Sequence, residues 1–212
     1  MKLGNTVIFG DSYSTFLGYI PEGYAVYYTP TRDIPDVNRV EDTWWHMLTT
    51  ELEGNIVRND SWSGSTVGFT GYNGVDCSKT SSFIYRANKL ESEGFFRDNK
   101  LDTVLIFGGT NDSWSNAPLG EEKLSDWENG DLYNVLPAIC YFVKRVKDLA
   151  PEARVVCVIN TEIKFAIMDA FIAACEKYGA EFVKLEEIEK MNGHPSVKGM
   201  VSIKEQIKAK LV

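Results

Sequence analysis

Five short runs of apolar, mostly β-branched residues recur along the chain. They lie at residues 6–9, 55–58, 103–107, 154–159 and 181–184. Continuous apolar runs of this length are typical of parallel strands that are covered on both faces. We therefore predict five strands that belong to one sheet.

Longer segments with helical periodicity separate these runs. They lie at residues 42–52, 81–90, 131–149, 161–178 and about 196–211. We expect Asp131 to cap the third segment, Pro151 to stop it and Gly179 to end the fourth. Strands that alternate with helices predict an α/β fold, here a flavodoxin-like, doubly wound parallel sheet of order 2-1-3-4-5 with helices on both faces.

The length of 212 residues suits one sizeable core, and no repeat or linker interrupts the chain. We therefore predict a single domain over residues 1–212. Three irregular stretches remain, at residues 18–41, 60–80 and 113–130. Loops of that length in a compact domain are usually functional or disordered.

The chain carries a formal net charge of -8, and no run of lysines or arginines offsets it. Nucleic acid and anionic membrane surfaces both require a basic face, so neither is an expected partner. No apolar stretch reaches the length of a membrane span, and the first residues lack the apolar core of a signal peptide. We expect no membrane insertion, and the location of the protein and its oligomeric state stay open.

The chain has four cysteines, Cys77, Cys140, Cys157 and Cys175, and only two histidines. The cysteines are widely spaced and form no CxxC pair, which indicates reduced, structural residues. Neither histidine has a partner at ligand spacing. We therefore predict no metal site.

Ligands of such sheets bind outside the carboxyl ends of the strands, near the switch in strand order. Gly10-Asp11-Ser12 follows the first strand, residues 59–64 follow the second, and residues 108–112 follow the third. Residues 192–195 precede the last helix. Each segment alone is explained by an ordinary turn, so only their combination points to a site.

In the order 2-1-3, Ser12 lies on the middle strand, with Gly64 on one flank and Asn111 on the other. A serine nucleophile requires donors within about 3 Å of the oxygen that becomes charged. The backbone N–H groups of Ser12 and Gly64 and the amide of Asn111 suit that role. His194 is the histidine at this edge and suits the role of base.

These four blocks resemble those of the SGNH (GDSL-type) hydrolases, in the same order, from about Val7 to Lys198. The resemblance implies an esterase with an acyl-enzyme mechanism and no metal or organic cofactor. Carried over by position, it makes Ser12 the nucleophile, His194 the base, and Gly64 and Asn111 the oxyanion donors together with the Ser12 N–H.

The chain departs from this family three residues before the histidine, where the family places an aspartate and Met191 stands here. In serine proteases, loss of the orienting acid costs about 10⁴-fold in rate. A backbone carbonyl of Met191 or a neighbour is an alternative acceptor for the ring N–H. Glu186, Glu187 and Glu189 are expected to be a solvated run. We therefore predict a Ser–His dyad.

Aromatic residues crowd the long loops. Trp62 and Trp114 stand within three residues of the expected oxyanion donors, and Tyr72 lies in the same loop as Trp62. Tyrosine and tryptophan suit sugar rings and acyl pockets, so these three are candidate substrate-binding residues. The first hypothesis is a short acyl group, such as acetyl, on a small molecule or carbohydrate.

Three alternatives remain open. A lysophospholipase or thioesterase would act on longer acyl chains, and a non-catalytic carbohydrate-binding module would keep the fold without turnover. A phosphate-binding flavodoxin-like protein is disfavoured because GxGxxG and GxxxxGK[ST] are absent. We expect structural roles for His46, Asp11 and Asp112.

Overall fold

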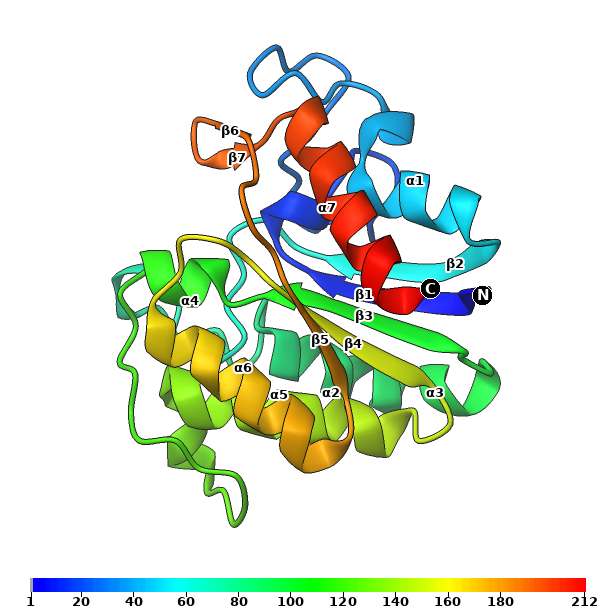
Figure 1. The fold of residues 1–212 in the computed structure, drawn as a ribbon. Helices are drawn as coiled ribbons and strands as arrows, with labels where there is room; N and C mark the ends of the chain where they lie inside the picture. Colours follow the sequence, from blue (N-terminus) through cyan, green and yellow to red (C-terminus); the bar gives the residue numbers. More distant parts are fainter. Residues whose placement is uncertain (1) are drawn as a thin grey trace.

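The five predicted strands form one parallel sheet in the computed structural model, which describes residues 2–212. The strands are β1 (Gly4–Gly10), β2 (Gly54–Ser61), β3 (Thr103–Gly108), β4 (Arg154–Ile159) and β5 (Glu181–Lys184). Their order is β2-β1-β3-β4-β5, which confirms the flavodoxin-like topology (Figure 1). The last residue of β1, Gly10, is paired with Ser61 of β2 and Phe107 of β3, so three strands end beside one another.

Helices cover both faces of the sheet. They are α1 (Trp44–Glu51), α2 (Phe83–Ser92), α3 (Phe95–Asp98), α4 (Thr110–Trp114), α5 (Val135–Leu149), α6 (Phe165–Tyr178) and α7 (Val197–Leu211). Short 3-10 helices lie at Ser12–Ser14, Val40–Asp42, Tyr72–Gly74 and Asn129–Tyr133. In Figure 1, α1 and α7 cover one face and α2, α5 and α6 the other.

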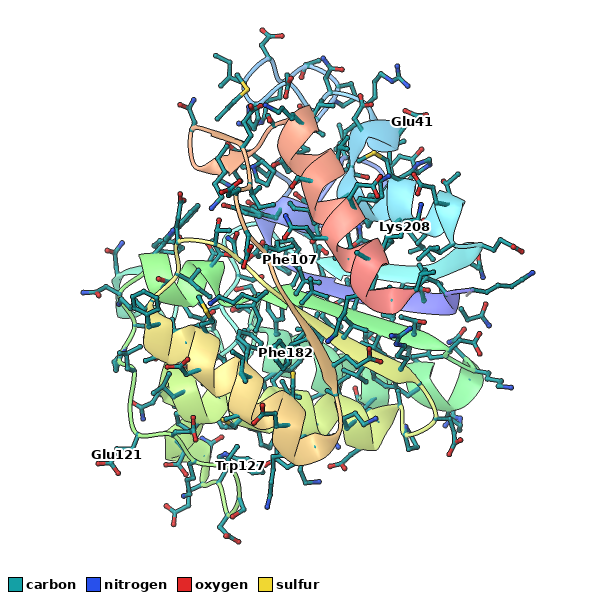
Figure 2. All side chains as sticks on the ribbon, viewed as in Figure 1. Glu41, Phe107, Glu121, Trp127, Phe182 and Lys208 are labelled. Carbon is teal, nitrogen blue, oxygen red and sulfur yellow. The ribbon has the colours of Figure 1, made fainter. Side chains whose placement is uncertain are left out.

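The two helical layers enclose two hydrophobic clusters, one on each face of the sheet. In β1, Val7 and Phe9 belong to the cluster under α5 and α6, while Ile8 belongs to the cluster under α1 and α7. Phe107 lies between the sheet and α7, whereas Glu121 lies at the periphery (Figure 2). Burial on both faces explains why the strands show no alternation of polar and apolar residues.

Two helices begin four residues later than the sequence pattern predicts. The helix expected from Asp131 begins at Val135, because Asp131 accepts hydrogen bonds from the Glu128 N–H and Lys123 Nζ, both at 2.7 Å, within the preceding 3-10 turn. The helix expected from residue 161 begins at Phe165. Gly179 ends it with a left-handed φ of 66°, as predicted.

The sequence pattern misses a small hairpin. Strands β6 (Lys190–Met191) and β7 (His194–Pro195) pair antiparallel across Asn192 and Gly193, which both have positive φ. An Asn-Gly pair between two strands is the usual signal for such a turn. The hairpin replaces the loop that was expected to carry His194.

The four cysteines are free and buried, as predicted. Within residues 2–212, no helix is both long and apolar enough to cross a membrane. In the same range, no group of three or more histidine, cysteine, aspartate or glutamate residues is arranged to hold a metal ion.

Candidate active site

The turn after β1 presents Ser12 at the carboxyl edge of the sheet. Asp11 caps the 3-10 helix Ser12–Ser14, and its Oδ1 accepts a hydrogen bond from the Tyr13 N–H at 3.0 Å. Gly10 is required here because a Cβ would lie 2.4 Å from Ser61 Oγ. The close approach of β1 to β2 at Gly10 therefore fixes where the turn begins, and Ser12 stands two residues later.

The structure brings His194 to Ser12 from the other end of the chain. His194 Nε2 lies 2.9 Å from Ser12 Oγ. His194 Nδ1 lies 3.2 Å from the carbonyl oxygen of Asn192, across the turn of the hairpin. With the proton on Nδ1, the ring donates to Asn192 and its Nε2 can accept the Ser12 proton. A neighbour of Met191 thus offers the carbonyl, as the sequence suggested.

The acidic run before the hairpin does not take this place. Glu189 Oε1 accepts a hydrogen bond from the Ser196 hydroxyl at 2.7 Å, and Glu189 Oε2 pairs with Lys198 at 3.1 Å. Within residues 2–212, neither Glu186 nor Glu187 makes a side-chain contact with His194.

The structure places Gly64 and Asn111 on the two flanks of Ser12, at the ends of β2 and β3. Asn111 Nδ2 donates to the Ser65 carbonyl at 3.0 Å, so Asn111 is bonded to the residue that follows Gly64. Gly64 has a φ of 82°, and a Cβ there would meet no protein atom within 4 Å. Its N–H donates to no residue in the described part of the chain. Open space and a free donor are what an oxyanion and its substrate require.

The sequence profile of the GDSL-like Lipase/Acylhydrolase family matches residues 5–211. The chain belongs to this family. It is a carboxylic ester hydrolase, because ester hydrolysis is the activity that defines these lipases and acylhydrolases.

Solved structures agree with the family. A protein of Bacteroides ovatus named as a GDSL-like lipase is 38% identical, with a TM-score of 0.90 over 100% of this chain and 99% of that one. One of Bacteroides uniformis with the same description is 40% identical, with a TM-score of 0.89 over 98% and 94%. An acetyl xylan esterase from the rumen bacterium Butyrivibrio proteoclasticus shares the fold at 16% identity, with a TM-score of 0.61 over 100% and 64%. A comparison with curated proteins gives no match.

In this GDSL-like hydrolase, aromatic rings hold the His194 imidazole. Tyr27 is stacked on it with 3.5 Å between ring centroids and an interplanar angle of 9°. The Arg32 guanidinium lies over the Tyr27 ring, 4.1 Å from its centroid. Trp114 and Tyr13 approach the imidazole at 5.8 and 5.2 Å. These contacts restrict the rotation of the ring, which no carboxylate in residues 2–212 contacts.

Two tyrosine hydroxyls fix the backbone on both sides of His194. Tyr13 donates to the Gly193 carbonyl at 2.5 Å, and Tyr28 donates to the Pro195 carbonyl at 3.0 Å. Sequence reasoning did not assign Tyr13, Tyr27 or Tyr28 to the site. The only signal for the latter two was the aromatic content of residues 18–41.

The pKa of His194 is lowered from 6.5 to about 4. Burial is the largest cause, and the nearby cations Arg32 and Lys190 lower the pKa further, while the hydrogen bond to Asn192 opposes them. The imidazole is therefore neutral over most of the physiological range. A neutral imidazole is the form that accepts a proton from serine.

This lowered pKa predicts an unusual pH profile. We expect kcat/KM for p-nitrophenyl acetate to stay high as the pH falls below about 6.5 and to drop with a midpoint near pH 4, where protonation removes the base. The measurement is initial rate against pH from about 3.5 to 8. Burial also raises the pKa of Asp11 to about 7. A step in the pH profile that disappears in Asp11→Asn is therefore due to the titration of Asp11. A midpoint near pH 6.5 in both proteins would contradict the prediction.

The contacts of Asp11 and Asp112 support the structural roles expected for them. The Asp112 carboxylate accepts hydrogen bonds from the N–H groups of Val67, at 3.0 and 3.1 Å, and Gly68, at 3.3 Å. Burial raises its pKa to about 6, and these two donors oppose that shift. Asp112 thereby fixes the loop that follows Gly64.

Tyr72, a candidate substrate-binding residue, also contacts one of the expected oxyanion donors. Its hydroxyl donates to Asn111 Oδ1 at 2.9 Å, while Asn111 Nδ2 donates to the Ser65 carbonyl. The two bonds together fix which side of the amide carries the nitrogen. Tyr72 is 40% exposed, so its ring also remains available to a ligand.

The Tyr72 bond gives a measurable expectation. In Tyr72→Phe, we expect kcat to fall about 2- to 10-fold, the equivalent of one hydrogen bond, because the Asn111 amide loses one of its two restraints. The matched control is Tyr19→Phe, since the exposed Tyr19 hydroxyl bonds to no residue in the described chain and should leave kcat unchanged. Equal kcat values for Tyr72→Phe and Tyr19→Phe would show that Tyr72 does not position the Asn111 amide.

The two tryptophans flank the site differently. The Trp62 ring packs against Tyr24 in a tilted arrangement with 4.3 Å between centroids, and the Trp62 backbone N–H donates to the Gly10 carbonyl. Trp114 ends α4, is 41% exposed, and lies in a T-shaped arrangement with the His194 ring. Both therefore lie beside the predicted catalytic residues.

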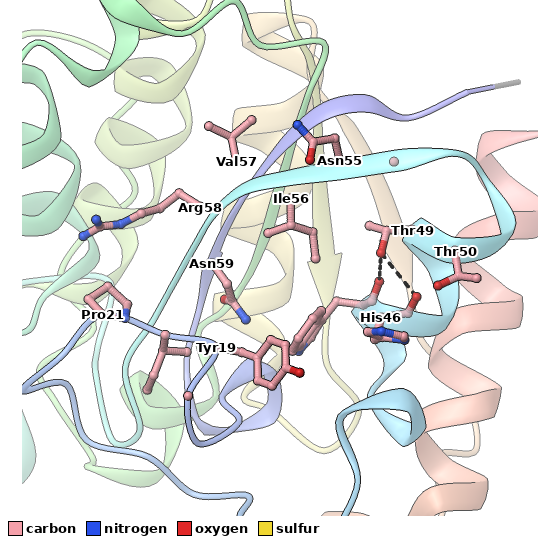
Figure 3. Close-up of a pocket in the computed structure, with 14 residues that line it drawn as sticks. Tyr19, Pro21, His46, Thr49, Thr50, Asn55, Ile56, Val57, Arg58 and Asn59 are labelled. Carbon is pink, nitrogen blue, oxygen red and sulfur yellow. Dashed lines mark hydrogen bonds between the residues drawn. The ribbon is translucent and has the colours of Figure 1, made fainter.

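A pocket of about 570 Å³ lies elsewhere, between β2, α1 and the loop that carries Tyr19 and Pro21 (Figure 3). His46, Thr49 and Asn59 line it, and it includes none of the predicted site residues. His46 lies in the first turn of α1 and has no contact with Ser12 among the described residues. Its placement agrees with the structural role expected for it.

Proposed function

We propose that residues 1–212 act as one esterase domain that hydrolyses short acyl esters of carbohydrates through an acyl-enzyme on Ser12. The observation that carries the proposal is the 2.9 Å contact between His194 Nε2 and Ser12 Oγ, with the Asn192 carbonyl behind the ring. The free Gly64 N–H and the restrained Asn111 amide flank this pair. Base, nucleophile and oxyanion donors are the parts that acyl transfer requires.

In the first half-reaction, Ser12 Oγ attacks the ester carbonyl carbon and its proton passes to His194 Nε2. The carbonyl oxygen becomes an oxyanion, which the Ser12 N–H, the Gly64 N–H and Asn111 Nδ2 stabilise. The tetrahedral intermediate collapses as His194 returns the proton to the leaving alkoxide. The alcohol departs, and the acyl group remains on Ser12.

In the second half-reaction, water attacks the acyl-enzyme and gives its proton to His194. The same donors hold the second oxyanion, and collapse releases the carboxylic acid and restores the Ser12 hydroxyl. The Asn192 carbonyl keeps the proton on Nδ1, which is the orienting part of the role an aspartate plays in a triad. Tyr27 adds the restraint on ring rotation that the carbonyl alone does not give.

The proposed substrate rests on the aromatic surfaces beside Ser12. The ring pair Tyr24–Trp62 lies on the Gly64 side, and the partly exposed Trp114 lies on the His194 side. Flat rings with polar tips suit sugar rings. The acetyl xylan esterase that shares this fold supports the same substrate class. The net charge of -8 counts against an anionic lipid surface.

A chain-length series tests the proposal. Wild-type protein is assayed with p-nitrophenyl acetate, butyrate and octanoate, and then for acetate release from acetylated xylan and fatty-acid release from a lysophospholipid. We expect kcat/KM to fall with chain length and acetate to be released from the xylan. A preference for octanoate and the lysophospholipid would favour the long-chain hydrolase. Binding of xylan without hydrolysis of any ester would favour the non-catalytic module.

A further inference from the structure

Arg86 on α2 is completely buried and uses all five of its N–H donors. Nε donates to the Ser81 carbonyl at 2.9 Å. Nη1 donates to the Asp60 carbonyl and to Asp60 Oδ2, the latter at 3.0 Å. Nη2 donates to the Gly10 carbonyl and to Ser65 Oγ, both at 3.2 Å. One planar group therefore joins three separate segments of the chain.

These segments are the ones that present the catalytic machinery proposed above. Gly10 is the last residue of β1 and stands two residues before Ser12. Ser65 follows Gly64, and its carbonyl accepts the hydrogen bond from Asn111 Nδ2. The guanidinium thus ties the strand end that carries the nucleophile to the loop that carries one oxyanion donor and holds the other.

The chemistry of this position selects arginine. A buried charge is costly unless it is paired and fully hydrogen-bonded, and Arg86 meets both conditions through Asp60, which is itself fully buried. Buried ion pairs can often be replaced by apolar residues without loss of stability. A five-donor fork, in contrast, fixes acceptors in one plane, and the three rotatable donors of lysine cannot do so.

We propose that Arg86 is a positioning residue for the oxyanion hole, which it holds in register with Ser12. This inference rests on the proposed esterase mechanism. Arg86 does not touch the substrate. It acts through Gly10 and Ser65, and a displacement of about 1 Å at such a site costs about 10²-fold in rate.

The test compares Arg86→Lys with Arg145→Lys. Arg145 also contacts α2, through Asn88 and Glu91, but it lies on the surface away from Ser12. We expect Arg86→Lys to lower kcat for p-nitrophenyl acetate about 10²-fold with KM changed less than about threefold, and Arg145→Lys to match the wild type. Inhibition by phenylboronic acid, which forms a tetrahedral anion on an active serine, should weaken in parallel with kcat.

Ser65→Ala keeps the test decisive if Arg86→Lys does not fold. It removes one acceptor of the fork, together with the hydrogen bond that Ser65 Oγ donates to the Trp62 carbonyl. It leaves the Arg86–Asp60 pair and the Ser65 carbonyl in place. We expect kcat and boronate affinity to fall about tenfold together. In Asn111→Ala, the same Ser65→Ala change should cost less, because part of its effect in the wild type passes through the Asn111 amide.

Two results would overturn the inference. One is wild-type kcat and boronate affinity in a folded Arg86→Lys protein, or in Ser65→Ala if the first variant is unfolded. The other is a Ser65→Ala loss that multiplies fully with the Asn111→Ala loss. A wild-type protein without turnover that depends on Ser12 would instead refute the proposed function, and the inference with it.

Discussion

Replacement of Ser12 with alanine is expected to lower kcat for p-nitrophenyl acetate by about 10⁶-fold, the loss seen when a serine hydrolase loses its nucleophile. The reason is that no other hydroxyl among the described residues contacts His194 Nε2. Activity that remains should come from the oxyanion donors acting on direct attack by water. The measurement is kcat of the purified variant against the wild type at neutral pH.

Two controls accompany the Ser12→Ala assay. Ser63→Ala removes a hydroxyl from the same edge of the sheet, and we expect it to retain wild-type kcat. The thermal midpoint of Ser12→Ala should stay within a few degrees of the wild type, because the Ser12 hydroxyl bonds to no group other than His194 in residues 2–212. Turnover within about tenfold of the wild type would rule out Ser12 as nucleophile.

Replacement of His194 with alanine is expected to lower kcat by about 10⁵- to 10⁶-fold. Without the imidazole, Ser12 has no base at hydrogen-bond distance, and the leaving alkoxide has no proton donor. The variant tests the dyad directly, since no carboxylate in the described chain contacts the ring and could take over.

His46→Ala is the matched control for His194→Ala, because it removes the other histidine of the chain. His46 lines the separate pocket beside α1 (Figure 3), so its loss should leave kcat unchanged. A large loss of kcat in His46→Ala together with a small loss in His194→Ala would contradict the assignment of His194 as the base.

The sequence could predict the sheet and the four site segments, because both follow from local rules. Apolar runs without alternation identify parallel strands, and the carboxyl ends of the first three bring Ser12, Gly64 and Asn111 to one edge. Met191 in place of an acid also indicated a carbonyl partner for His194, and the Asn192 oxygen lies in that position.

The support of the site could not be predicted, because it consists of contacts between residues far apart in the chain. Tyr28 bonds to the Pro195 carbonyl across 167 positions, and Tyr27 is stacked on His194 from the same loop. Arg86 lies in an amphipathic helix, where an arginine is usually on the exposed face. Its burial depends on hydrogen bonds to Asp60, Gly10 and Ser65. The periodicity of the sequence does not predict contacts between residues so far apart in the chain.

The predicted start of α5 was wrong for a local reason. Asp131 is a good helix cap, yet its carboxylate is engaged by Lys123 and the Glu128 N–H. Asp131 therefore belongs to the 3-10 turn Asn129–Tyr133, and α5 begins only after that turn ends.

The most direct test of the central claim is the site at which a fluorophosphonate probe labels the protein. The probe reacts with a serine whose proton is accepted by a neighbouring base, and the adduct mimics the tetrahedral intermediate. Peptide mass spectrometry of the labelled wild type should show one modification, on Ser12, that is lost in His194→Ala. A label on another residue, or none on a protein that still hydrolyses p-nitrophenyl acetate, would contradict the account.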